Sequence, residues 1–182
     1  DIYTDKFGVK ENLNAKQLTI YTKNILRKEV YNPEALITGA NFLISNTGSI
    51  VFTENEGNIL KSTSFAPIHI IVAGIDKMIT SIDELSVLLP LSSLYDNNKN
   101  ISSLYSIINS PSISEDKVQN LYLILLNNNR TNILSKEKQR NILSCIQCGA
   151  CLEVCPIYNV IGGHTYKEYN PGPVGSISLP ML

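Results

Sequence analysis

The sequence contains no cysteine outside one short segment, since all four cysteines of its 182 residues lie between Cys145 and Cys155. Disulfides confined to that segment would link only neighbouring turns, so a secreted disulfide framework is excluded. A chain whose cysteines all lie in one site is typical of a reducing compartment. We therefore expect a cytoplasmic protein.

The sequence also lacks an excess of charge and a long apolar run. Its 15 Lys and Arg residues nearly balance its 16 Asp and Glu residues, so nothing indicates a nucleic-acid partner. The longest apolar stretch, residues 65–75, contains Pro67 and His69 and is too short to cross a bilayer. No signal peptide is visible. With 43% hydrophobic and 17% charged residues, the composition is that of a globular protein with a buried core.

The four cysteines follow the spacing C-x2-C-x2-C-x3-C, and Pro156 comes directly after the last of them. Bacterial-type ferredoxins use this run to hold [4Fe-4S] clusters. Two residues between cysteines allow one tight loop to bring Cys145, Cys148 and Cys151 to three corners of a cubane. We therefore predict electron transfer, with these three thiolates as ligands of one cluster.

Cys155 has a different predicted role, because in two-cluster ferredoxins the cysteine before the proline ligates the other cluster. No second run exists in this sequence, so the first cluster lacks its fourth ligand and Cys155 lacks a cluster of its own. The chain also begins with Asp1 rather than Met. We expect it to be an internal piece of a longer protein with two clusters, inactive by itself and prone to lose its metal in air.

Zinc is the alternative metal for these cysteines. Structural zinc sites usually combine two pairs of ligands that are separated by a dozen or more residues. Only one compact run is present here, which favours iron and sulfide.

Hydrophobic periodicity predicts alternating strands and helices before the cysteines. Asn14 with Gln17, and Ser81 with Glu84, form capping boxes that begin two helices. The other predicted elements are apolar or alternating runs: a hairpin over residues 41–45 and 49–53, a central strand in a covered sheet over 67–73, a buried strand over 118–126 and a helix over 135–143. This order predicts an α/β fold, a mixed sheet flanked by helices with the cysteine loop appended.

Several ordered segments resemble a known family. They are residues 38–58, residues 69–77, the cysteine run, the Gly-Gly-His-Thr-Tyr segment 162–166 and the Pro-Gly-rich segment 171–176. Together they resemble the iron-sulfur subunits of bacterial L-lactate utilisation, the lactate utilisation protein B family. The resemblance covers nearly the whole chain.

The resemblance implies a LUD domain, related to the NagB/RpiA/CoA-transferase-like fold, followed by two ferredoxin-type cysteine runs. Residues 1–130 would then be the carboxyl-terminal part of the LUD domain. Residues 131–182 would be a linker helix and the first cluster motif, with the second motif absent. The family is described as oxidising L-lactate to pyruvate with partner subunits, so the implied function is an electron-transfer subunit that passes electrons to an acceptor.

Two further functions stay open beside electron transfer. Glu54 and Glu56 follow a predicted strand, and in transferase-like folds such a loop often borders the ligand pocket, so either residue is a candidate nucleophile or base of a small-molecule enzyme. A solvated hairpin end is the plainer interpretation of both. The third function is a scaffold on which partner subunits assemble.

Other side chains near the cysteines carry weaker hypotheses. His164 is a candidate donor to a cluster sulfur or a proton relay, and a loop-fixing hydrogen bond is the alternative. His69 fits a core histidine. The cations that precede the cysteines either raise the cluster potential and steer an acidic partner or form an ordinary solvated face: Arg130, Lys136, Lys138 and Arg140. We also expect a cut sheet to self-associate through its exposed edge.

Overall fold

The computed structural model describes residues 2–8, 13–31, 33–55, 57–97, 104–111, 113–114, 117–118, 120–166 and 171–181. The strands are β1 (Leu36–Gly39), β2 (Phe42–Ile44), β3 (Ser49–Glu54), β4 (Ile68–Gly74), β5 (Met78–Ile79), β6 (Leu104–Ile108), β7 (Ile113–Ser114), β8 (Lys117–Val118) and β9 (Asn120–Leu126). The α-helices are α1 (Ile2–Phe7), α2 (Ala15–Tyr31), α3 (Asn58–Phe65), α4 (Leu85–Asn97), α5 (Arg130–Leu134), α6 (Ala150–Glu153), α7 (Pro156–Ile161) and α8 (Gly172–Ser178). The 3-10 helices are η1 (Ile75–Lys77), η2 (Ile82–Glu84), η3 (Arg140–Ser144), η4 (His164–Tyr166) and η5 (Leu179–Met181).

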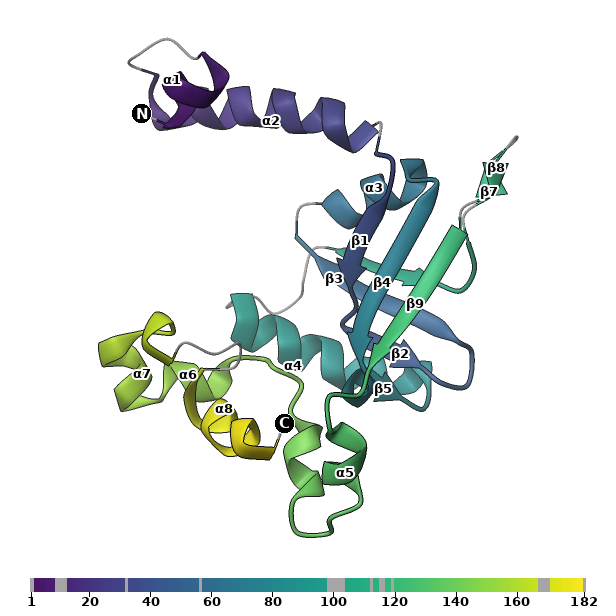
Figure 1. Cartoon of the computed structure of the whole chain (residues 1–182), viewed down its shortest axis with the longest axis vertical. Coiled ribbons are helices and arrows are strands. Elements are labelled where there is room, and N and C mark those ends of the chain that lie inside the picture. The colour runs from purple at the N-terminus through teal and green to yellow at the C-terminus, as the bar shows by residue number, and fades with distance from the viewer. Residues whose placement is uncertain are drawn as a thin grey trace.

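Two sheets form the centre of the fold (Figure 1). One is parallel, with the order β1-β4-β9. The other has the order β5-β2-β3-β6 and is mixed, because β2 pairs antiparallel with β3 and parallel with β5. Helices flank both sheets, so the predicted mixed α/β class is confirmed.

The two central strands of the mixed sheet, β2 and β3, are buried on both faces, which explains why they lack an apolar–polar alternation. Towards the parallel sheet, Leu43, Ile50 and Phe52 pack with Ile71 and Ala73 of β4. The opposite face meets α4 and one residue of the cysteine loop; its members are Phe42, Ile44, Val51 and Leu85, with Leu88, Leu89 and Ile146 packed against them. The core therefore has two layers, one on each side of β2 and β3.

Local sequence signals account well for the first half of the chain. The Asn14 amide donates to Gln17 Oε1 and the Gln17 amide to Asn14 Oδ1, each at 2.9 Å, which confirms the first capping box. Glu84 accepts from the Ser81 amide at 3.1 Å in the second. The predicted hairpin is β2–β3, with Gly48 at a φ of 68° in its turn.

Two predictions about the second half are wrong. β9 is not buried, since the side chains from Tyr122 to Leu126 are 43–55% exposed. It lies at the edge of the parallel sheet, and only β4 pairs with it among the described strands. The helix predicted over residues 135–143 is replaced by α5 and η3. Asn127 Oδ1 accepts from the Thr131 amide at 3.0 Å and starts a helix earlier, which ends at Leu134.

The strand over residues 67–73 is central, as predicted, although the sheet is covered well on one face only. His69, Ile71 and Ala73 are buried, whereas Ile68 on the other face is 36% exposed. No described helix is both long and apolar enough to span a membrane.

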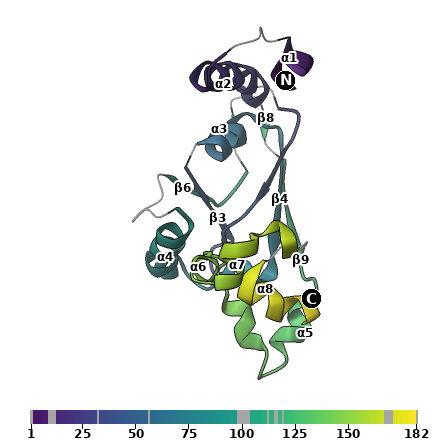
Figure 2. The same cartoon turned by 90° about the vertical axis from the view of Figure 1, so that its left-hand side faces the viewer.

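The cysteine-bearing elements lie at one end of the molecule. α1 and α2 lie at the opposite end, beyond the amino-terminal ends of β1 and β4, in both views (Figures 1 and 2). α6, α7 and α8 gather beside α4, close to α5 (Figures 1 and 2). α5 follows β9 directly, so the chain enters the cysteine segment from the carboxyl-terminal ends of β4 and β9.

His69 is a core residue, as its position in an apolar strand predicts. Its side chain is 0% exposed, stacks on Phe52 with ring centroids 6.0 Å apart, and places Nε2 2.8 Å from Thr38 Oγ1. Within the described residues Nδ1 has no hydrogen-bond partner. Burial therefore lowers the pKa of His69 below its ordinary value.

This burial predicts a pH-dependent stability. An unfolded chain takes up a proton on His69 as the pH falls through about 6.5, while the folded chain resists it. The contribution of neutral His69 to the free energy of unfolding is therefore complete above that pH. As the pH decreases further, the free energy of unfolding decreases by up to about 1.4 kcal/mol per pH unit. Urea titrations between about pH 7.5 and 5.5 should show a shallower fall for His69→Gln. The matched control is exposed His164→Gln, which should keep the wild-type slope; equal slopes in all three proteins would contradict the prediction.

Candidate functional site: the cysteine loop and the strand ends that hold it

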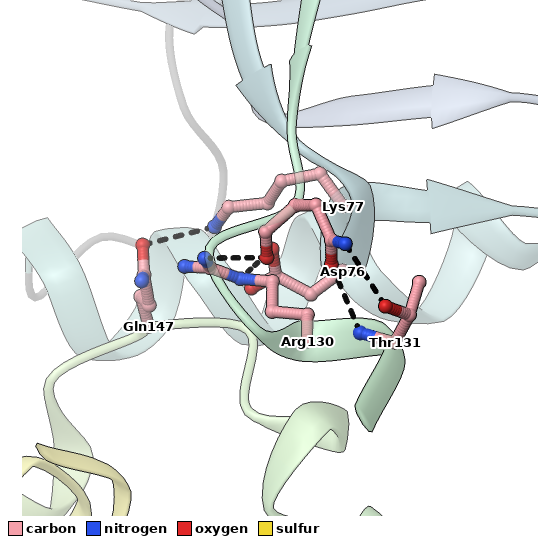
Figure 3. A network of polar contacts seen from close by, with 6 residues as sticks. Asp76, Lys77, Arg130, Thr131 and Gln147 are labelled. Carbon is pink, nitrogen blue, oxygen red and sulfur yellow. Dashed lines mark hydrogen bonds and ion pairs between the residues drawn. The ribbon is translucent and has the colours of Figure 1, made fainter. Parts of the chain in front are cut away.

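Two loops that follow parallel strands meet beside the cysteines. Asp76 lies just after β4 and Arg130 just after β9, and carboxyl ends of neighbouring parallel strands share one edge of a sheet. Arg130 Nε lies 2.6 Å from Asp76 Oδ1, and the two side chains are only 16% and 10% exposed (Figure 3). The ion pair is therefore largely shielded from water, where such pairs are stronger than at the surface.

Arg130 is held in place from its own loop. Its Nη1 donates to the Asn127 carbonyl at 3.3 Å, and the Asn127 side chain also bonds Thr131, whose hydroxyl accepts from Nδ2 at 2.9 Å. Asn128 and Asn129 adopt positive φ values of 38° and 62°, a conformation that Asn tolerates better than most residues. The Asn-rich turn thus aims Arg130 at Asp76.

Gly74 gives the carboxylate of Asp76 its room. A Cβ atom at position 74 would lie 2.2 Å from Asp76 Oδ1, so any larger residue displaces the carboxylate from Arg130. By contrast, a Cβ atom at Gly39 would have its nearest neighbour at 3.9 Å.

The cysteine loop is attached to the rest of the chain at two points. Ile146 packs against the core cluster of Phe42, Ile44, Val51 and Leu85. Its neighbour Gln147 accepts a hydrogen bond from Lys77 Nζ at 3.0 Å on Oε1 (Figure 3). An apolar anchor and a polar one, one residue apart, fix the loop between Cys145 and Cys148.

Three of the four cysteines border one cavity of about 680 Å³. Cys145, Cys148 and Cys151 line it, and Cys155 does not. The other walls come from both parts of the chain and are mostly apolar: Leu88 and Leu91 of α4, Ile133 of α5, Leu152 of α6, and Pro171 and Val174 near the start of α8. Asp76 and Arg130 also reach the cavity, so the ion pair forms part of its wall.

The loop backbone is shaped to receive negative charge. Gln147 and Gly149 have positive φ values of 60° and 80°. Among the described residues, no protein acceptor receives a hydrogen bond from the amides of residues 146–149, which lie in no helix or strand. A positive φ at every second residue forms backbone nests that bind anions, including the sulfides of iron-sulfur sites. The positive φ of Gln147 is uncommon for a residue with a side chain and marks a functional constraint.

The donor set fits an iron-sulfur cluster, because three thiols border one cavity and a cubane receives each thiolate on a different iron. In the described part of the chain, no three Cys, His, Asp or Glu side chains are close enough together to hold one metal ion. All four cysteines are free and half-buried.

Cys155 faces a different environment. It precedes Pro156 at the start of α7, and its Sγ accepts from the Tyr158 amide at 3.5 Å. Neighbouring apolar side chains are open, with Val154 80% and Ile157 61% exposed. Three cysteines thus share one cavity, and the fourth lies at an exposed apolar surface.

The other predicted site residues that the structure describes do not join the cysteines. Glu54 is buried, and its carboxylate accepts from the Ile59 and Leu60 amides at 2.8 and 3.0 Å, so it caps the start of α3. Glu56 lies outside the described residues. His164 is exposed in η4 and does not line the cavity. Neither described residue is placed to react with a ligand in that cavity.

The four cations also separate. Arg130 belongs to the cavity wall, whereas Lys136 and Lys138 are exposed. Arg140 lines a neighbouring pocket of about 540 Å³.

Sequence reasoning missed the residues that connect the two parts of the chain: Asp76, Lys77, Ile146 and Gln147. A usable signal exists for the first two, because they follow a strongly predicted parallel strand at its carboxyl end. None exists for Gln147, whose partner Lys77 is 70 positions away.

Two family models match different parts of this chain. The LUD domain family matches residues 5–130, and the 4Fe-4S dicluster domain matches residues 141–181. The chain is 33% identical over 183 residues to Lactate utilization protein B of Bacillus pumilus and 34% identical over 185 residues to that of Bacillus cytotoxicus. These alignments cover the whole chain but 38% of each relative. A crystal structure of a DUF162 family protein from Deinococcus radiodurans aligns with a TM-score of 0.39 and 16% identity, over 64% of this chain and 71% of that one.

The ion pair generates a prediction about Gly74. Gly74→Ala should destabilise the chain by about 1–3 kcal/mol, because it separates a largely buried pair of charges. Gly39→Ala, also in a parallel strand, should cost far less. Urea unfolding of both variants measures the difference. In an Asp76→Ala background, Gly74→Ala should lose most of its cost, and an undiminished cost there would show that the clash is not with the carboxylate.

Proposed function

This chain belongs to the LUD domain family, and on that premise we propose that it is the electron-transferring, iron-sulfur part of a longer protein that takes part in oxidising L-lactate to pyruvate. The relatives that cover the whole chain carry the name Lactate utilization protein B, which supports the substrate. The match of residues 141–181 to the 4Fe-4S dicluster domain supports the cofactor.

One observation carries the proposal: Cys145, Cys148 and Cys151 line a common, mostly apolar cavity beneath a loop with free amides. When bound, a [4Fe-4S] cluster accepts and releases single electrons. The three thiolates would hold it, and the amides of residues 146–149 would point donors at its sulfides. Ile146 packs the loop against the core, and the Asp76–Arg130 pair forms part of the cavity wall.

We assign Cys155 to a second cluster, whose other ligands lie outside this chain. Its absence from the cavity lining and its exposed apolar surroundings support that assignment. The longer protein would then hold two clusters. In the same proposal, residues 1–130 form the carboxyl-terminal part of the LUD domain and residues 131–182 carry the cluster motif. Partner subunits and an electron acceptor complete the reaction.

The transferase-like alternative receives no support from the described residues. Its candidate Glu54 is committed to two backbone amides of α3 and contributes nothing to the cavity. We therefore retain electron transfer as the function, and the LUD domain as the support of the cluster loop.

Cysteine substitutions in the longer protein test the cluster assignment. Anaerobic reconstitution of the wild type should give about eight irons and as many labile sulfides, as two cubanes require. Each of the substitutions Cys145→Ser, Cys148→Ser and Cys151→Ser should remove about four irons and one electron paramagnetic resonance signal. Cys155→Ser should remove the other signal, while Ser135→Ala serves as the control. A protein that takes up zinc alone would end the proposal, and loss of one and the same signal in all four variants would end the assignment of Cys155.

The open edge of the parallel sheet generates a prediction about the 182-residue chain on its own. Among the described strands only β4 pairs with β9, and Tyr122 and Ile124 of β9 are exposed, which invites pairing with a second copy. Light scattering at rising concentration should show dimers. The double substitution Tyr122→Lys and Ile124→Lys should weaken dimerisation at least about tenfold, since buried charge is costly. Val160→Lys, at an 84% exposed site on α7, is the control; a monomer at every concentration would refute self-association.

A further inference from the structure

Lys77 reaches from the turn after β4, within the LUD domain, to the cysteine loop. It is the last residue of η1, and its Nζ donates to Gln147 Oε1 at 3.0 Å (Figure 3). Gln147 lies between Cys145 and Cys148 and holds the positive φ of 60° on which the shape of the loop depends. The contact therefore joins the LUD domain to the backbone turn that carries two of the three cavity thiols.

The ammonium group of Lys77 brings a positive charge that no carboxylate pairs with among the described residues. Its neighbour Asp76 is engaged by Arg130 at 2.6 Å, and the hydrogen-bond acceptor of Lys77 is the neutral amide of Gln147. Because Asp76 pairs with Arg130, the positive charge of Lys77 lies beside the cysteine loop without a carboxylate paired to it among the described residues.

The electrostatic surroundings agree with this placement. Burial lowers the pKa of Lys77 below its ordinary value, and the positive charge of Arg130 acts in the same direction. The negative charges of Asp76 and Cys145 oppose that shift. Lys77 is therefore partly removed from water and within electrostatic range of the first cysteine of the loop, where a charge is screened less than at the surface.

We propose that Lys77 sets the reduction potential of the cluster held by Cys145, Cys148 and Cys151, by placing one positive charge against the loop and holding Gln147 in position. It is a positioning residue and not a ligand. Reduction adds one electron, and so one negative charge, to the cluster, and a nearby cation favours the reduced form. The inference rests on the proposed function, since it requires that the loop holds a cluster.

Redox titration of the longer protein, reconstituted anaerobically and followed by electron paramagnetic resonance, tests the inference. Lys77→Met removes the charge and keeps most of the side-chain length, and Lys77→Arg keeps the charge. Lys136→Met is the matched control, because it removes an exposed cation and leaves the hydrogen bond between Lys77 and Gln147 in place.

The ratio of reduced to oxidised first cluster at a fixed potential should fall about tenfold in Lys77→Met. This is the effect of one charge at about 12 Å with an effective dielectric constant of about 20, and it corresponds to about 59 mV for a one-electron couple. Lys77→Arg should stay within about twofold of the wild type, and Lys136→Met should not differ from it.

Gln147→Leu extends the test, because it leaves every charge in place and removes only the acceptor. The ratio should fall in the same direction by about threefold, and this variant decides the matter if Lys77→Met takes up no iron. Equal shifts in Lys77→Met and Lys77→Arg would overturn the inference, and so would unchanged potentials in both Lys77→Met and Gln147→Leu. In either case the wild-type cluster signals would leave the proposed function intact. A wild type without any cluster signal would overturn both.

Discussion

The seating of Ile146 on the core is the contact on which the candidate site depends. The residue comes from the middle of the cysteine loop, yet it packs against side chains of β2, β3 and α4. Ile146 is partly buried, so its packing contributes a part of the roughly 1.5–3 kcal/mol that full burial of such a side chain gives, and it holds a short loop that has no strand or helix of its own. Because Cys145 and Gln147 flank Ile146, the same contact places a thiol at the cavity and an amide within reach of Lys77.

The parallel sheet supplies the polar half of the attachment. β4 and β9 run in the same direction side by side, so the loops that follow them begin at one edge. Those loops contribute Asp76, Lys77 and Arg130, and the cysteine segment comes after both strands in the sequence. The LUD domain therefore does more than carry the cluster motif: it provides one wall of the cavity and the charges beside it.

Each error of sequence reasoning has its own physical cause. β9 has the apolar run of a buried strand, but periodicity does not report whether a neighbour exists to cover it, and here it forms an edge. The helix expected over residues 135–143 has suitable residues, but the side chain of Asn127 begins α5 earlier and the chain turns after Leu134. Glu54 was a candidate ligand-pocket carboxylate, but its oxygens accept hydrogen bonds from two backbone amides of α3 instead.

The sequence by itself determined the α/β class, the two capping boxes, the β2–β3 hairpin and the cysteine spacing, because each of these depends on residues close together in the chain. The separation of Cys155 from the other cysteines also follows from local spacing and from the helix that Pro156 begins. Only the tertiary structure decided that Lys77, Asp76 and Arg130 meet the cysteine loop. Their contacts join residues up to 70 positions apart, and such pairs are set by how strands align at a sheet edge and by which apolar side chain finds room in the core.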